Sequence, residues 1–141
     1  MTQPPAPPTT QKPPPVTQPP PVTQPPPPAP VVGPISRSTA SIVEQWVGQP
    51  NTCGGAKTSS IGVSITNATS ATLSWSGGGL GGLAAMSKQG STFSATVGPF
   101  DESAVSPPPS SVTLTVTITA HGPGGSHQRS TTVSLADCYF G

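Results

Sequence analysis

Charged residues are scarce in this 141-residue chain. Four acidic and five basic residues give a net charge of +1 with neutral histidines, and neither sign forms a run. A nucleic-acid-binding surface needs several Lys or Arg side chains to displace phosphate counterions, and anionic membranes attract proteins in the same way. Four acids also leave little from which to build a catalytic acid and base. The composition therefore argues against nucleic acid or membrane surfaces as partners and predicts that the protein is not an enzyme.

Long hydrophobic runs are missing and cysteines are few. No stretch is apolar enough to span a bilayer, and residues 1–5 lack the basic and apolar parts of a signal peptide. Cys53 and Cys138 belong to no Cys-x-x-Cys pair, so we predict one disulfide between the ends of the folded region. Closing this loop of about 85 residues would stabilise the fold by roughly 4–5 kcal/mol in the chain-entropy model. The alternative is a pair of buried thiols in a cytosolic protein.

A disulfide requires an oxidising compartment, which a chain without an export signal does not reach alone. We therefore expect this sequence to be an excerpt of a longer surface or membrane protein. Met1 would have been supplied for expression, and an export or anchoring segment would lie upstream. The expected location is extracytoplasmic, at the cell surface or secreted.

Proline is abundant and concentrated at one end. Sixteen of the 22 prolines precede Ile35, and the unit Pro13–Gln18 (PPPVTQ) recurs as Pro19–Gln24. Proline fixes φ and removes a backbone donor, so residues 1–34 are predicted to be a disordered or polyproline II linker. Fully extended at ~3.1 Å per residue, this linker would reach roughly 100 Å. Residues 35–141 remain for a single domain.

The domain sequence consists of short runs of Val, Ile, Thr and Ser separated by Gly, Pro and Asn, which is typical of strands. The clearest run is Val112–Thr119, where apolar and threonine residues alternate and predict one core face and one wet face. It is expected to form a hairpin with Thr131–Leu135 across Gly122–Gly125. Two further hairpins are predicted: Ile61–Ile65 with Ala71–Trp75 around Asn67, and Ala84–Ser87 with Thr92–Val97 across Gly90.

Ser41–Val47 fits either a strand or one to two helical turns, and a strand is favoured because no helix elsewhere could pack with it. About seven strands without a helix predict an all-β antiparallel sandwich. Its predicted core is Ile61, Val63, Ile65, Leu73, Trp75, Met86, Phe93, Ala95, Val97, Val112, Leu114, Val116, Ile118, Val133 and Leu135.

Three segments resemble bacterial immunoglobulin-like domains, most closely those of actinobacterial surface proteins. They are Ala71–Gly79 (ATLSWSGGG), Gly90–Phe100 (GSTFSATVGPF) and Val112–Leu135 (VTLTVTITAHGPGGSHQRSTTVSL). In that family the last two strands form a Thr/Val ladder around a glycine-containing turn, and a middle strand carries a tryptophan. The resemblance covers roughly residues 36–141 and implies an immunoglobulin-like β-sandwich. Cys53 and Cys138 depart from the antibody arrangement, so their bridge is expected to tie sheet edges.

The resemblance also implies a setting. Comparable modules sit outside the membrane behind proline-rich linkers, on anti-sigma factors, receptor-type Ser/Thr kinases or secreted wall proteins. The predicted function is therefore a non-catalytic module on a wall-spanning stalk. It would serve as a spacer, a ligand sensor or a protein-contact domain of a larger protein, and its partner would be a protein or a cell-wall glycan. A monomer is expected.

Three features of the sequence could in principle bind a cofactor or a metal ion. Gly77–Gly82 formally matches the GxGxxG dinucleotide fingerprint, but no helical segment follows to hold a pyrophosphate, so a mobile loop is predicted. His121 and His127 flank the last turn and could face each other, yet a third metal ligand is lacking. Asp101 and Glu102 are too few carboxylates for calcium. No metal and no cofactor are expected.

Three aromatic residues, Trp46, Tyr139 and Phe140, are not assigned to the core and are candidate ligand contacts. Exposed aromatic rings stack on sugars in carbohydrate-binding sandwiches. Such modules also carry a disulfide between their ends and a Pro/Thr linker, so the alternative function is a carbohydrate-binding module of a secreted or wall-associated protein. Alternatively, Trp46 covers a core edge, while Tyr139 and Phe140 close the end beside Cys138.

Overall fold

The computed structural model describes residues 2–21, 23–45, 54–101 and 111–138, and within them it contains nine strands and no helix. The described chain accordingly has no helix that could cross a membrane. The strands are β1 (Val31–Arg37), β2 (Ser41–Val43), β3 (Ser59–Thr66), β4 (Ser70–Gly77), β5 (Leu80–Ala85), β6 (Ser87–Gln89), β7 (Thr92–Val97), β8 (Ser111–Gly122) and β9 (Gly125–Ala136).

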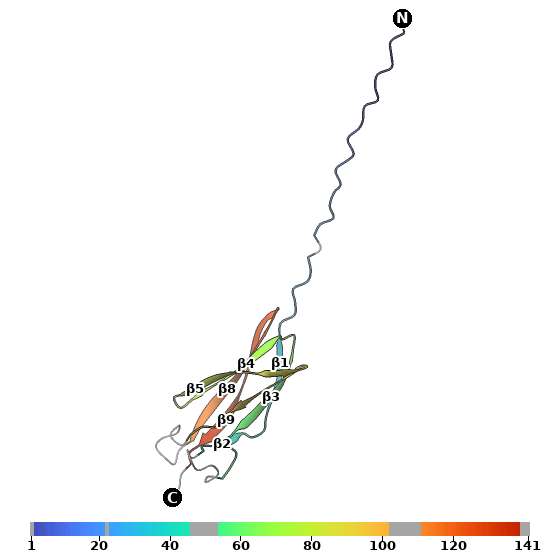
Figure 1. The fold of residues 1–141 in the computed structure, drawn as a ribbon. Coiled ribbons are helices and arrows are strands. Elements are labelled where there is room, and N and C mark those ends of the chain that lie inside the picture. The colour runs from blue at the N-terminus through green and yellow to red at the C-terminus, as the bar shows by residue number, and fades with distance from the viewer. Residues whose placement is uncertain (1, 22, 46–53, 102–110, 139–141) are drawn as a thin grey trace.

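The strands form two sheets packed face to face, so the predicted all-β sandwich is confirmed. Sheet A has the order β1-β3-β7-β6, and sheet B has the order β2-β9-β8-β4-β5. All neighbours are antiparallel except β2 and β9, which are parallel. Residues before β1 form an extended segment that projects from one end of the sandwich (Figure 1).

Strand β8 lies at the centre of sheet B, between β4 and β9. Its apolar residues Leu114, Val116 and Ile118 are fully buried, while the threonines between them face away from the core. This follows from the two-residue period of a strand, in which successive side chains point to opposite faces. The predicted β8–β9 hairpin is confirmed, with both strands extended to the turn at Gly122–Gly125.

Twelve of the predicted core residues are buried, and the other three, Trp75, Ala95 and Val112, pack partly buried against them. Four buried apolar residues were not predicted: Val32, Ile42, Ala71 and Ala120. Phe93, from β7 in sheet A, is the largest fully buried side chain among the described residues, whereas Trp75, the largest residue of the predicted core, is only partly buried.

Trp75 instead lies at the margin of the core, where it covers a glycine. Its indole meets the ring of Phe100 edge-on, with 6.5 Å between ring centroids and an interplanar angle of 84°. Gly82 is its cross-strand partner on β5, and a Cβ atom at that position would clash with the indole. The glycine is therefore required by the tryptophan's position.

The hairpin predicted from Ile61–Ile65 and Ala71–Trp75 is wrong. These segments are strands, but β3 belongs to sheet A and β4 to sheet B. Asn67 has a left-handed φ of 59° and makes the turn, as expected, but the chain crosses there from one sheet to the other. A short polar turn between two alternating runs does not distinguish these outcomes, because the turn does not specify that β3 pairs with β1 and β7 while β4 pairs with β5 and β8.

The glycine-rich segment is part of a hairpin and not a loop between strands. Gly78 and Gly79 have φ of 58° and 82°, as the two central residues of a type I′ turn require. Gly81 and Gly82 lie within β5, which pairs with β4. No helix follows this turn among the described residues, so the segment lacks the helix N-terminus of a dinucleotide site.

Other boundaries also differ from expectation. β1 begins at Val31, four residues before the predicted start of the domain, and Pro34 lies where the β1–β3 register shifts. Proline is tolerated at such irregularities on an edge strand. β2 covers Ser41–Val43 of the ambiguous segment, while Trp46 and Val47 lie outside the described residues. Of the predicted third hairpin, Ser87–Gln89 pairs with β7, but Ala84 and Ala85 belong to β5 in the other sheet.

The Gly82–Trp75 contact gives a stability prediction. We expect Gly82→Ala to lower the free energy of unfolding by about 1–3 kcal/mol, because the new methyl group displaces a large ring. Gly54→Ala is the matched control, since a Cβ there would meet nothing within 4 Å, and it should change the value by less than about 0.5 kcal/mol. Urea denaturation of both variants tests this, and equal effects would contradict it.

Candidate functional site

A concave feature lies where the proline-rich segment meets the domain. Three chain segments converge there: Pro27–Pro30 of the stalk, the β3–β4 turn at Asn67–Thr69, and the β8–β9 turn around Pro123. We call this region the stalk junction. Both turns lie at the same pole of the sandwich because β3 and β8 run towards it and β4 and β9 run away from it.

The stalk is held at the junction by close backbone contacts. Pro30 is buried, and the side-chain amide of Asn67 donates a hydrogen bond to the carbonyl of Ala29 at 3.3 Å. On the opposite side, Gly124 lies so close to the Pro28 carbonyl that a Cβ atom would clash with it. The last stalk residues are thus packed between two turns of the domain.

The first residues of β1 are also tied to β9. The backbone N–H of Val32 donates to Nδ1 of His127 at 3.0 Å, and Nη1 of Arg129 donates to the Val32 carbonyl at 3.4 Å. Val32 itself is buried in the core. β1 is therefore bound on one side by its ladder with β3 and on the other by side chains from sheet B.

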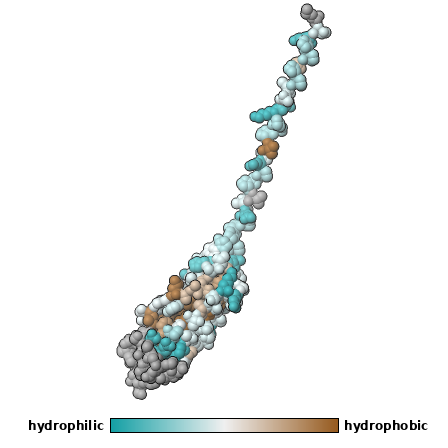
Figure 2. Space-filling model, viewed as in Figure 1, coloured by the Kyte–Doolittle hydropathy of each residue, from teal (hydrophilic) through white to brown (hydrophobic). Residues whose placement is uncertain are grey.

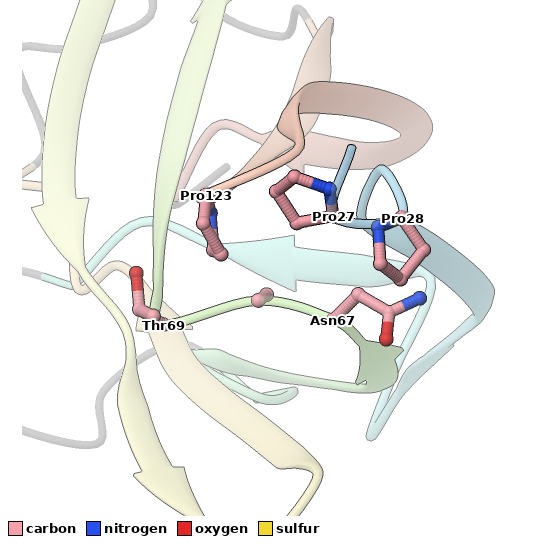
Figure 3. A pocket seen from close by; sticks show the side chains of 6 residues that line it. Pro27, Pro28, Asn67, Thr69 and Pro123 are labelled. Atoms are coloured by element: carbon pink, nitrogen blue, oxygen red, sulfur yellow. The ribbon is translucent and has the colours of Figure 1, made fainter. Parts of the chain in front are cut away.

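A pocket of about 250 Å³ lies at the junction. Figure 3 shows its three proline rings, Pro27, Pro28 and Pro123, along one side, and Asn67 and Thr69 along the other. None of the lining residues is ionisable. The pocket offers shape and apolar contact, and its lining supplies no acid, base or metal ligand.

The outer face of sheet B is rich in hydroxyl groups. The register places Ser74, Thr117 and Ser130 side by side across three strands, with neighbouring rows of the same kind. Thr117 Oγ1 and Ser130 Oγ are 2.9 Å apart, and the Gln128 side chain donates to Thr119 Oγ1 at 3.0 Å. Side-chain hydrogen bonds between strands pair part of this polar face internally, which leaves a neutral, ordered surface.

The two histidines do not face each other. Their register partners differ, Ser126 for His121 and Ala120 for His127, so their side chains lie on opposite faces of the β8–β9 ribbon. Within the described residues no group of three His, Cys, Asp or Glu could hold a metal ion. The sequence did not predict that His127 accepts a hydrogen bond from the backbone N–H of Val32 in β1.

The other candidate site residues lie partly or wholly beyond the described ranges. Trp46, Tyr139, Phe140 and Cys53 are outside them, so the ligand contacts and the disulfide remain predictions. Cys138 is half-buried just after β9, and the described chain contains no free cysteine. Asp101 is exposed and accepts a hydrogen bond from the Gln45 amide at 3.3 Å.

Comparison with known proteins identifies no family. No protein-family model matches the chain, and no curated protein matches it. Among solved structures, the crystal structure of an engineered protein aligns with a TM-score of 0.45 and 21% sequence identity. The alignment covers 76% of this chain and 20% of that one, so this chain spans about a fifth of that protein's length.

The contact of Gly124 with the stalk gives the second prediction. We expect Gly124→Ala to displace Pro28 and loosen the start of β1, so that the Val32 amide exchanges with solvent roughly fivefold faster, equivalent to about one hydrogen bond. Hydrogen exchange followed by NMR measures this. Ser126→Ala, an exposed change in the next strand, is the control. Unchanged exchange at Val32 in Gly124→Ala would show that the stalk is not held there.

Proposed function

We propose that this chain is a non-catalytic, extracytoplasmic immunoglobulin-like module that acts as an in-line spacer and protein-contact domain of a longer surface protein. The observation that carries the proposal is the position of the two chain ends. The stalk enters the domain at the junction pole, and the described chain leaves it at the opposite pole (Figure 1). A domain connected in this way adds its full length to the structure that carries it.

The length that it adds follows from β9. This strand begins at Gly125 beside the stalk junction and runs through 12 residues to Ala136. At about 3.3 Å per residue the strand spans roughly 35–40 Å. The contacts described above fix the last stalk residues against the domain, which favours a continuous rod over two parts joined by a free hinge.

The strand order supports the immunoglobulin-like assignment. Constant-type immunoglobulin domains have sheets ABED and CFG, and variable-type domains extend the second sheet beyond strand C. With β1, β3, β7 and β6 as strands A, B, E and D, sheet A has the order A-B-E-D. Sheet B then reads G-F-C-C′ from β9 to β5, and Trp75 lies on strand C, as in that family.

The surfaces support contact rather than catalysis. The outer face of sheet B is neutral and hydroxylated, and the pocket at the stalk junction is lined by proline and small polar residues. Neutral surfaces of this kind suit a spacer that meets other proteins without strong electrostatic attraction. The stalk surface is likewise mostly pale or hydrophilic in Figure 2.

The compartment is tested by counting thiols. If the module is extracytoplasmic, unreduced and denatured protein should contain no free thiol, because Cys53 and Cys138 are then joined. Titration with a thiol reagent measures this, and the same protein after reduction is the control and should give two. Two thiols before reduction would show that the extracytoplasmic part of the proposal is wrong.

The spacer role is tested by the length of the molecule in solution. A polyproline II stalk of about 30 residues adds up to roughly 90 Å, whereas a flexible coil of that length adds about 30 Å. Small-angle X-ray scattering of the full chain should therefore give a maximum dimension well above 100 Å. A value near 70 Å, the sum for a coil and the domain, would contradict the rod. The measurement is made at low protein concentration so that any association does not add to it.

A further inference from the structure

The sandwich has four sheet edges, and they are not equally protected. Unpaired backbone groups on an edge attract another strand unless the edge is short, charged, irregular or interrupted by proline. In sheet A, β1 carries Pro34 and a register shift, and β6 has three residues that include Lys88. In sheet B, β2 has only three residues. β5 has six residues, Leu80–Ala85, without charge or proline.

The backbone groups that β5 presents outward follow from its register with β4. In a two-residue hairpin the pair that flanks the turn, Gly77 and Leu80, exchanges both hydrogen bonds, and hydrogen-bonded pairs then alternate along the ladder. The hydrogen bond from the Met86 N–H to the Ala71 carbonyl, 3.0 Å long, fits the same alternation.

It follows that Gly82 and Ala84 use their N–H and C=O groups within the hairpin. Gly81, Leu83 and Ala85 direct theirs away from β4, and among the described residues no strand pairs with them there.

The side chains on this edge have a matching pattern. Gly81, Leu83 and Ala85 are exposed, and the Leu83 side chain, at 71% exposure, is the most exposed large hydrophobic side chain of the described domain. Figure 2 shows hydrophobic side chains at this margin of the domain, where β5 lies in Figure 1. The small residues at 81 and 85 flank Leu83 and leave space beside it for a second large side chain.

We propose that β5 is a homodimerisation edge, which pairs antiparallel with β5 of a second copy about a two-fold axis at Leu83. In this register Leu83 faces the partner's Leu83, and Gly81 faces the partner's Ala85, with each facing pair exchanging N–H···O=C bonds. The outward backbone groups of all three residues are then satisfied. The two Leu83 side chains lie next to each other on the outer face of the extended sheet, shielded from part of the water that surrounds each of them now.

A second copy fits this edge because the segment is its own complement. In an isologous contact residue i of one copy faces residue j of the other, and only a group on the two-fold axis, here Leu83, faces its own symmetry mate, so a charge at that position would face a like charge. β5 has no charged residue, and its order of small, large and small outward side chains is the same when read in either direction. The proposal goes beyond the spacer function and does not depend on it. It differs from the monomer that the sequence analysis predicts.

Sedimentation equilibrium of the full chain tests the proposal. A single strand pair buries little area, so we expect self-association with a dissociation constant of roughly 10 μM to 1 mM. Leu83→Lys should weaken association at least about tenfold, because two ammonium groups would then lie opposite each other. Val16→Lys, which removes an exposed hydrophobic side chain (92%) from the stalk, is the matched control and should associate like the wild type.

Leu83→Pro provides a second variant. It removes an N–H that points away from β4, so the β4–β5 hairpin can remain while the centre of the dimer contact is lost. Circular dichroism of both variants checks that the sandwich is retained. A wild type that stays monomeric up to about 1 mM would overturn the proposal and leave this edge to a strand of another protein. Association that persists unchanged in Leu83→Lys would overturn it too, since the contact would then lie elsewhere.

Amide exchange distinguishes this register from any other association. The amides of Gly81, Leu83 and Ala85 should become protected as concentration rises, whereas those of Gly82 and Ala84 should be protected at every concentration. Protection that does not change with concentration would contradict the pairing. Thiol content, and the solution length at low concentration, should be the same in wild type and Leu83→Lys, so failure here is distinguishable from failure of the proposed function.

Discussion

The alternation of apolar residues and threonine along β8 is the constraint on which the rest of the structure depends. β8 is the central strand of sheet B, and its buried side chains face Phe93 and the other core residues of sheet A. A shift of one residue in its register would expose Leu114, Val116 and Ile118 and bury the threonines between them. The position of β8 therefore also fixes β4 and β9, and through their turns it fixes the place where the stalk is held.

Features that depend on neighbouring residues could be predicted from the sequence. The β8–β9 hairpin, the burial of every residue predicted as core on β3 and β8 except Val112, and the absence of helix in the described chain all follow from two-residue periodicity and turn composition. The sequence predicts the turn at Asn67 correctly, but it does not predict that the chain crosses there from one sheet to the other. Whether a turn joins two strands of one sheet or passes between sheets depends on distant partners, and no local pattern records them.

The glycine-rich segment shows a second limit of local patterns. A run of glycines is compatible with a loop, and the position of Trp75 explains why the strand residue at 82 is glycine. The stalk junction was missed for the same reason. Pro28, Asn67 and Gly124 are far apart in sequence, and each has an ordinary local role as linker or turn. Their meeting at one pole follows from strand topology, which brings both turns to the end where the chain enters.

The parallel pairing of β2 with β9 has a mechanical consequence. Tension between the stalk and the end of β9 would act first on β1 and its ladder with β3, and then on β2, whose start it would pull towards the stalk pole while the end of β9 is pulled towards the other. Because the two strands run in the same direction, this force slides them past each other and loads all their hydrogen bonds together. An antiparallel pair pulled from one end would instead open one bond at a time. The fold thus places a contact that resists shear behind β1, where tension that detached β1 would reach it.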